Sequence, residues 1–477
     1  MTYPRDLVGY GRNVPQAKWP GGARIAVQFV INYEEGGENN ILHGDAASEA
    51  FLSEIVGAAA WPGMRHMNME SIYEYGSRAG FWRLHRMFTA RHMPVTVYGV
   101  AHAMMRHPDA VAAMNEAGWE IASHGLKWID YRDFPAEDEA RHIAEAVRIH
   151  AEVAGARPLG MYQGRTSANT LRLTQEEGGF LYSADSYADE LPYYVEGPNG
   201  RGGAGPFLIV PYTLDANDMR FATPQGFNSG DQFFSYLKDS FDILYSEGET
   251  IPKMMSIGLH CRLVGRPGRA AALARFLDYV QGHEKAWVAT RLDIARHWVM
   301  NHAPQGGWKP SRISKPLFLT RFGGIFEHSP WVAEAAFAGG FGPEADTAPG
   351  LHAAMAKAMR AGSDEQKRAL ILAHPDLAGR LAVAKQLTAD STKEQASAGL
   401  DRLSPDELAE FTRLNDVYKA KFGFPFILAV KGLLKAEILQ NFRTRIDNSM
   451  TDEFATALAE IERIALLRLG DILPERT

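Results

Sequence analysis

The stretch that decides the fold of the first half of the chain is Ile25-Ala-Val-Gln-Phe-Val-Ile-Asn-Tyr-Glu-Glu-Gly-Gly37. It opens with the apolar run Ile25–Val30, which is typical of a buried strand. The strand ends in Asn32, Tyr33 and the two carboxylates Glu34 and Glu35. In parallel α/β barrels, functional groups gather at the carboxyl ends of the strands, so this pattern predicts both a fold and a site.

Similar β-rich runs alternate with helical stretches as far as about residue 290. The further candidate strands are Val95–Val100, Glu120–Ser123, Leu159–Tyr162, Leu181–Ala184, Leu208–Val210, Met254–Leu259 and Trp287–Ala289. Helical patterns lie between several of them, at Phe81–His92 and Glu137–Val153. This alternation indicates a largely parallel sheet covered by helices. With roughly eight strands in one domain, it favours a closed or nearly closed, distorted (β/α) barrel over an open sheet.

The pattern changes after residue 302. Residues 303–316 are rich in Pro, Gly and basic residues and are predicted to be a linker. Residues 317–477 are predicted to be all-α. In Ser404–Gly423, for example, apolar residues recur at helical spacing, Ser404 and Glu407 form a capping box, and Gly423 ends the helix. The predicted domains are therefore 1–302 and 317–477.

Composition excludes several classes of protein. A net charge of −7 argues against a nucleic-acid partner, which would need a clustered basic patch. No stretch approaches the ~20 apolar residues needed to cross a membrane, and neither end carries a secretory or peroxisomal signal. Cys261 is the only cysteine, so neither an intrachain disulfide nor a thiolate metal cluster is possible. We expect a cytoplasmic protein.

Polar residues follow several other candidate strands. These strand ends carry His124, Arg165, Asp185 and His260, which should converge with the two glutamates on one rim of the barrel. Other interpretations stay open from the residues alone. The glutamates could be solvated loop acids, the histidines satisfied core residues, and Arg165 a structural partner of Asp185. Cys261 is expected to be a packing residue rather than a nucleophile.

The motifs Asn-Tyr-Glu-Glu-Gly, Ser-His-Gly-Leu-Lys-Trp and Tyr-Gln-Gly-Arg, followed by a strand-terminal histidine, resemble the polysaccharide deacetylase (NodB-like) superfamily. Members of that superfamily use an Asp-Asp pair and a His-x-x-x-His motif, and one Asp and both His residues bind a metal. Here the acid pair is Glu34-Glu35, and Trp128 replaces the second motif histidine. Because tryptophan cannot ligate a metal, the three-ligand site is broken.

Three stretches resemble the allantoinases recruited from that superfamily, and the match covers nearly all of residues 1–302. They are Glu34-Glu35-Gly36-Gly37-Glu38, Ser123–Trp128 and Asp189-Glu190-Leu191-Pro192-Tyr193-Tyr194. The resemblance implies opening of the hydantoin ring of allantoin to give allantoate, without a metal or cofactor. A weak residual metal site formed by Glu35, His124 and His260 stays open.

Opening a cyclic amide requires a base to activate water, donors for the oxyanion and an acid for the leaving nitrogen. We expect Glu35 or His124 to be the base and His260 the acid, so that Glu35→Gln abolishes turnover. We expect the substrate to be bound by Arg165, with nearby backbone N–H groups, by Trp128 packed on the flat ring, and by Glu34 and Asp185.

The second half resembles the 2-oxo-4-hydroxy-4-carboxy-5-ureidoimidazoline (OHCU) decarboxylases, an all-helical, cofactor-free family. The motifs are Glu327-His-Ser-Pro-Trp331, His374-Pro-Asp-Leu377, Ser391-Thr-Lys-Glu-Gln395, Phe424-Pro-Phe-Ile427 and Arg443-Thr-Arg445. The resemblance implies that the catalytic residues are His374, Glu394 and Arg445, and that the pocket residues are Pro375, Ser391, Gln395, Phe426 and Ile427.

The chemistry suits these residue types. The unsaturated ring accepts the electron pair left by CO₂, a His–Glu pair handles protons, and an arginine fork grips the carboxylate. From the residues alone, however, Glu394 could form a capping box with Ser391, His374 could cap a helix, Arg445 could be a surface charge, and Glu327–Pro330 could be structural.

The two resemblances point to adjacent steps, since the decarboxylase makes allantoin and the hydrolase opens it. We therefore expect a bifunctional ureide-pathway enzyme whose partners are these small-molecule substrates. Self-association is implied by both families. The alternative is a metal-dependent carbohydrate or amide deacetylase with a non-catalytic helical oligomerisation domain.

Overall fold

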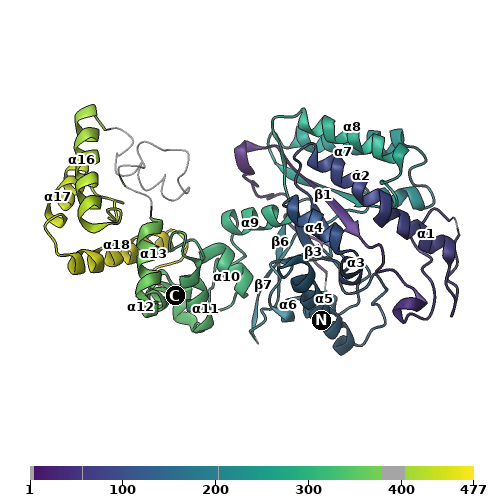
Figure 1. Ribbon diagram of the computed structural model, residues 1–477, viewed down its shortest axis with the longest axis horizontal. Helices are drawn as coiled ribbons and strands as arrows, with labels where there is room; N and C mark the ends of the chain where they lie inside the picture. The colour runs from purple at the N-terminus through teal and green to yellow at the C-terminus, as the bar shows by residue number, and fades with distance from the viewer. Residues whose placement is uncertain (1–4, 56, 202, 375–376, 378–402, 477) are drawn as a thin grey trace. The chain divides into compact units, whose positions relative to one another are not determined.

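The computed structural model describes residues 5–55, 57–201, 203–374, 377 and 403–476. The chain forms two compact units, Met1–Gln305 and Gly306–Thr477 (Figure 1). The division between the units falls inside the proline- and glycine-rich segment 303–316.

The first unit is built around one sheet, which has nine strands in the described residues. The strands are β1 (Ile25–Tyr33), β2 (Thr96–Gly99), β3 (Glu120–Ser123), β4 (Gly160–Met161), β5 (Tyr182–Ser183), β6 (Tyr193–Pro198), β7 (Ala204–Ile209), β8 (Lys253–His260) and β9 (Ala286–Val288). Their order is β6-β7-β5-β4-β3-β2-β1-β8, and β9 also pairs with β1. Every pair is parallel except the β6–β7 hairpin.

All eight expected strands overlap observed ones, which confirms the parallel α/β prediction. The sequence missed β6, a partly exposed strand that contains Gly197 and Pro198 and pairs only with β7. Glycine and proline are poor strand formers, so this antiparallel edge carries little sequence signal. Between β8 and the chain that follows β7 there is an isolated parallel bridge, Asn217 to Gly258. The barrel is therefore distorted and almost closed.

Helices lie outside this sheet (Figure 1). They are α1 (Met67–Tyr75), α2 (Phe81–Thr89), α3 (Ala101–Arg106), α4 (Pro108–Glu116), α5 (Ala136–Ala154), α6 (Thr170–Glu177), α7 (Gly230–Glu247), α8 (Pro267–Gln281) and α9 (Arg291–Asn301). The helix predicted over Phe81–His92 ends earlier than expected because His92 adopts a left-handed conformation with φ 51°. The helix predicted over Glu137–Val153 is confirmed as α5.

A π-helical turn, Gly76–Gly80, joins α1 to α2 and packs against the rim of the barrel. A Cβ on Gly76 would collide with the carboxylate of Glu35, and one on Gly80 with the carbonyl of Cys261. Both positions therefore need glycine so that the turn can approach the rim closely. Turns of this kind often occur at functional sites.

The described part of the second unit contains helices and no strand, as predicted. The helices are α10 (Lys315–Phe322), α11 (Pro330–Ala338), α12 (Ala348–Ala361), α13 (Asp364–Ala373), α16 (Pro405–Phe422), α17 (Lys435–Arg445) and α18 (Met450–Gly470). The capping box of Ser404 with Glu407 and the left-handed Gly423 after α16 are both confirmed.

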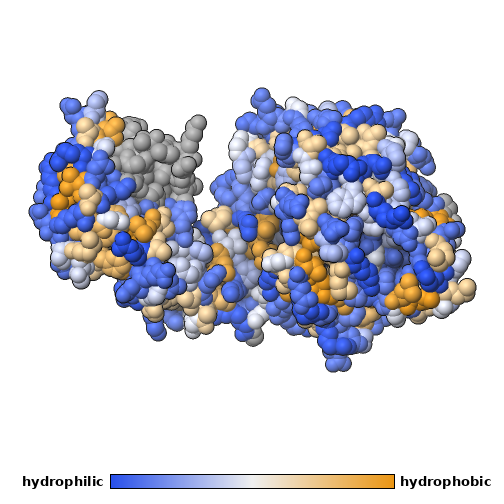
Figure 2. Space-filling model, in the orientation of Figure 1, coloured by the Kyte–Doolittle hydropathy of each residue, from blue (hydrophilic) through white to orange (hydrophobic). Residues whose placement is uncertain are grey.

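The visible surface of both units is largely hydrophilic, with scattered apolar patches (Figure 2). Among the described residues, no helix combines the length and the apolar character that crossing a membrane requires.

Candidate functional site

Glu34 lies at the centre of a buried polar cluster on the rim of the barrel. Its Oε1 is 3.3 Å from Nε2 of His124 and 3.4 Å from Nε2 of His260. The three residues follow or end β1, β3 and β8, whose carboxyl ends meet at this rim. Register contributes to this closeness, because Asn32 in β1 lies directly opposite His260 in β8. The convergence predicted from the strand ends is confirmed for these side chains.

His260 is held on its other side by Asp218, which is fully buried. Nδ1 of His260 is 2.6 Å from Oδ1 of Asp218, and the backbone N–H of His260 donates to Oδ2 at 2.7 Å. Burial alone would lower the pKa of His260, but the charges of Glu34 and Asp218 outweigh it and raise the pKa to about 9. At neutral pH the ring is therefore an imidazolium that donates from both nitrogens.

His124 is also held through both of its ring nitrogens. Its Nδ1 is 2.9 Å from the backbone carbonyl of Tyr162. Because a carbonyl oxygen only accepts, Nδ1 carries a proton. The carboxylate of Glu34 likewise only accepts, so its 3.3 Å contact with Nε2 is made when that nitrogen also carries a proton.

Arg262 is fully buried beneath the same cluster. Its Nη2 donates to Oε2 of Glu34 at 2.7 Å, and its Nη1 lies 3.5 Å from Oε1 of Glu35. The guanidinium lies over the rings of Tyr73, 4.3 Å from the ring centre, and Trp128, 5.2 Å from the ring centre. Arg262 comes three residues after the predicted strand Met254–Leu259, and no role is predicted for it from the sequence.

The two adjacent glutamates have different surroundings. Both are buried, so the interpretation as solvated loop acids is wrong. Burial would raise the pKa of Glu34, but the charges of Arg262 and His260 hold it well below its ordinary value. The oxygens of Glu35 accept the backbone N–H groups of Arg262 (3.2 Å) and of Glu34 (3.1 Å). Burial raises the pKa of Glu35 above its ordinary value. The charge of Arg262 opposes this rise, and the charge of Glu34 adds to it.

Arg165 and Trp128 lie together at the edge of the cluster. The guanidinium of Arg165 is 3.9 Å from the centre of the Trp128 ring and pairs with Glu49 at 3.4 Å. Asp185 instead accepts the backbone N–H groups of Gln163 (2.8 Å) and Gly164 (2.7 Å). The pairing of Arg165 with Asp185 considered from the sequence is therefore wrong, because Asp185 fixes a turn.

A hollow of about 680 Å³ opens beside these residues. Glu49, Phe51, Gly164 and Arg165 are among the residues that line it. A Cβ on Gly164 would lie 3.3 Å from Cε1 of His124, so the wall at Gly164 adjoins the histidine. Arg165 thus lines the hollow directly, and Gly164 lies between the hollow and His124.

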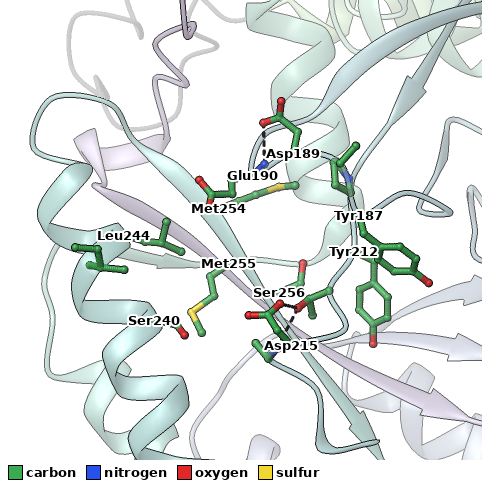
Figure 3. A pocket seen from close by; sticks show the side chains of 15 residues that line it. Tyr187, Asp189, Glu190, Tyr212, Asp215, Ser240, Leu244, Met254, Met255 and Ser256 are labelled. Atoms are coloured by element: carbon green, nitrogen blue, oxygen red, sulfur yellow. Dashed lines mark hydrogen bonds between the residues drawn. The ribbon is translucent and has the colours of Figure 1, made fainter. Parts of the chain in front are cut away.

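A second cavity, of about 600 Å³, lies at the barrel seam between β8 and the chain after β7 (Figure 3). Met254 and Met255 of β8 line it together with Tyr187, Tyr212 and Asp215 (Figure 3). The predicted site residues are not among those that line it. Its link to the rim is Tyr212, whose hydroxyl accepts a hydrogen bond from Asn32 at 3.0 Å.

In the second unit, Arg445 is buried, so the interpretation as a surface charge is wrong. Its Nη1 donates to the carbonyl of Ile427 at 2.7 Å, and its Nε donates to Oε1 of Glu453 at 2.9 Å. The guanidinium lies 4.5 Å from the centre of the Phe426 ring. The structure therefore brings together three predicted residues, Arg445, Phe426 and Ile427.

Sequence reasoning missed Glu453, which holds Arg445 and also accepts from Asn448 at 2.7 Å. The remaining predicted residues can be described only in part. His374 is buried at the end of α13, where its Nδ1 is 2.9 Å from the carbonyl of Leu370, as expected of a helix-capping residue. The other four, Pro375, Ser391, Glu394 and Gln395, lie outside the described residues.

The donor set of the first unit does not fit a resident metal ion. Among the described residues, no group of three or more His, Cys, Asp or Glu side chains is placed to hold one. Trp128 offers no lone pair, and the cation beside both glutamates is Arg262.

Comparison with known proteins finds a different family in each part of the chain. The profile of the polysaccharide deacetylase family matches residues 69–177, and that of the OHCU decarboxylases matches residues 311–470. The crystal structure of PuuE allantoinase is 58% identical, covers 63% of this chain and 99% of its own, and has a TM-score of 0.62.

Two curated relatives each match one part of the chain. A Schizosaccharomyces pombe protein with the provisional name polysaccharide deacetylase is 42% identical over 317 residues, 63% of this chain and 99% of that protein. The OHCU decarboxylase of Halalkalicoccus jeotgali is 42% identical over 166 residues, 35% of this chain and 90% of that protein. The chain therefore belongs to the polysaccharide deacetylase family in its first part and to the OHCU decarboxylase family in its second.

The electrostatics of His260 give a testable pH dependence. Its pKa rises from an ordinary 6.5 to about 9 on folding, so the folded state binds the proton more tightly. This stabilisation is complete below about pH 6.5 and is lost as the pH rises through about 9. We expect the unfolding temperature of the first unit to fall between pH 7 and 9.5 in calorimetry, and to fall less in Asp218→Asn. Equal slopes for the two proteins would contradict the assigned ion pair.

Proposed function

We propose that the protein is a bifunctional enzyme of urate breakdown. Its second unit decarboxylates OHCU to (S)-allantoin, and its first unit hydrolyses allantoin to allantoate. The observation that carries the hydrolase half is the buried Glu34–His124–His260 cluster, which supplies both a base and an acid. Gly164 lies between His124 and the hollow that Arg165 lines. The 58% identity to an allantoinase along the first unit supports the hydrolase assignment.

The cluster divides the proton transfers between its two histidines. Nε2 of His124 takes a proton from water, and the carboxylate of Glu34 stabilises the imidazolium that forms. The resulting hydroxide attacks a ring carbonyl carbon, and His260 protonates the nitrogen as the ring C–N bond breaks. The acid that forms ionises to allantoate, and Glu34, which contacts both histidines, passes the proton from His124 back to His260. The sum is allantoin plus water giving allantoate and one proton.

Other residues bind and position rather than transfer protons. Arg165 lines the hollow and is placed to hold the ring carbonyls, with Trp128 packed behind it. Asp185 shapes the turn that carries Gly164. Because the oxygens of Glu35 accept two backbone N–H groups, we assign it to positioning, and we assign the proton chemistry to Glu34, His124 and His260.

In the second unit, Arg445 holds the substrate carboxylate against the ring of Phe426, and the carbonyl of Ile427 fixes the orientation of the guanidinium. Loss of CO₂ leaves an electron pair on the ring, and we propose that His374 and Glu394 control the proton at that carbon. Pro375, Ser391 and Gln395 complete the proposed pocket. The resemblance of this part of the chain to cofactor-free decarboxylases supports the assignment.

The proposed partners are the two small-molecule substrates and further copies of the same chain, and the proposed location is the cytoplasm. Self-association is an expectation from the two families. A reducing compartment agrees with a single cysteine, Cys261, that is buried in the first unit.

The first experiment incubates the full chain with allantoin and measures allantoate, with and without a strong chelator. We expect equal product in both samples, because Arg262 rather than a metal stands beside the carboxylates. Product that is lost with chelator would restore a metal at Glu35, His124 and His260. Absence of product, with metal-dependent release of acetate from an N-acetyl sugar, would favour the deacetylase alternative.

The two glutamates can be separated by matched amide variants. We expect Glu34→Gln to lower kcat for allantoin by about 100-fold or more, because it removes the charge that stabilises the His124 imidazolium. Glu35→Gln should cost less, because Glu35 contacts neither histidine within hydrogen-bonding distance. Steady-state kinetics on both variants decides the order, and a larger loss for Glu35→Gln would reverse the assignment.

The decarboxylase half is tested with OHCU freshly generated from urate, by following (S)-allantoin through its circular dichroism. We expect Arg445→Ala to lose about 100-fold or more of kcat/KM, because a bidentate partner of the carboxylate is removed. The matched control is Arg443→Ala, in which an exposed arginine that contacts Glu410 is lost. Similar losses in both variants would remove Arg445 from the site.

A further inference from the structure

We propose that Arg262 is the positioning residue of the hydrolase site and takes the part that a metal ion would play there. Its guanidinium is the resident cation that holds the carboxylates of Glu34 and Glu35. The inference rests on the proposed hydrolase function and extends it, because it names the group that makes the site independent of metal.

The contacts of Arg262 make it the neighbour of both carboxylates. Nη2 donates to Glu34 at 2.7 Å, Nη1 lies 3.5 Å from Glu35, and Nε donates to the carbonyl of Leu52 at 3.2 Å. The flat faces of the guanidinium lie against Tyr73 and Trp128. The guanidinium of arginine is planar and forked, so it can donate to two acceptors at once while its faces stack on aromatic rings.

Elementary electrostatics explains why a cation is needed here. Two adjacent carboxylates out of contact with water repel each other and lose their hydration, and each costs several kcal/mol unless it is paired. Arg262 supplies that pairing from within the chain. A divalent cation would have to approach the same oxygens against the charge of the guanidinium, and Trp128 would give it no ligand.

The chain also fixes where Arg262 can be. The backbone N–H of Arg262 itself donates to Glu35 at 3.2 Å, so the residue holds that carboxylate from two sides. The preceding residue, Cys261, packs its carbonyl against Gly80 and Gly265, where a Cβ on either glycine would collide with it. Arg262 therefore has little freedom to move away.

The consequence for catalysis is the orientation of Glu34. With Oε2 held by Arg262, Oε1 points to Nε2 of both histidines, at 3.3 and 3.4 Å. Arg262 need not touch the substrate, since it acts through Glu34.

The kinetic test compares Arg262→Gln with Arg262→Lys in the full chain. We expect kcat for allantoin to fall about 100-fold in the glutamine variant and about tenfold in the lysine variant, with small changes in KM. Added guanidinium ion should restore part of the activity of Arg262→Gln. The control, Arg266→Ala, removes an arginine that stacks over Tyr75 at 3.7 Å and pairs with Glu54, outside the cluster. The proposal would be overturned if Arg262→Gln and Arg262→Lys lost the same fraction of kcat and guanidinium restored no activity to Arg262→Gln.

A second test does not depend on turnover. Calorimetry measures Zn²⁺ binding to the full chain for wild type, Trp128→His, and Trp128→His combined with Arg262→Gln. We expect one tight Zn²⁺ site only in the double variant. There the histidine supplies a ligand, and loss of the guanidinium vacates the position that the metal ion would occupy. Equally tight binding by Trp128→His alone would overturn the proposal even where the wild type hydrolyses allantoin. If the wild type does not hydrolyse allantoin, the proposed function is refuted. The Zn²⁺ binding result would still decide whether Arg262 occupies the position of a metal ion.

Discussion

The contact between Arg262 and Glu34 is the interaction on which the first unit depends. It lies at the end of the barrel, where both side chains are removed from water and the 2.7 Å hydrogen bond carries full charges. Such a pair is stable only when the remaining donors and acceptors are also satisfied. The surroundings supply most of them through the two imidazoles, the carbonyl of Leu52 and the second carboxylate, Glu35. Removing either Arg262 or Glu34 leaves the other charge buried without its main partner, so these residues act as one cluster.

This cluster of polar residues can form because the sheet is parallel. Parallel strands deliver their last residues to one rim, and the register of β1 against β8 sets Asn32 beside His260. Glu34, two residues after Asn32, then reaches the imidazole without any unusual backbone. The π-helical turn adds the final constraint, since its glycines let the backbone close over Glu35 and Cys261. Fold and site are therefore parts of one arrangement.

The sequence was sufficient wherever the signal is local. Strand periodicity located the eight expected strands, and Ser404, Glu407 and Gly423 marked the ends of α16. The rule that polar groups follow parallel strands found Glu34, His124 and His260. Asp218 was missed because it lies in a short 3-10 turn 42 residues before its partner. Glu453 was missed for a similar reason, since it looks like an ordinary first-turn acid of α18 until Arg445 folds against it. Side-chain contacts between residues far apart in the sequence follow no fixed spacing, so sequence periodicity cannot reveal them.

The two units use a buried arginine in different ways. A guanidinium has five N–H donors. In Arg262 the donors are turned toward Glu34, Glu35 and the carbonyl of Leu52, so the charge is used within the protein. Arg445 has one carboxylate partner, Glu453, and one carbonyl partner, Ile427, and its flat face rests on Phe426. Three N–H donors of Arg445 are engaged within the described residues, and the guanidinium also lies beside Tyr418. Arg262 thus joins two acids at the rim of the barrel, whereas Arg445 joins one acid to the residues Ile427 and Phe426.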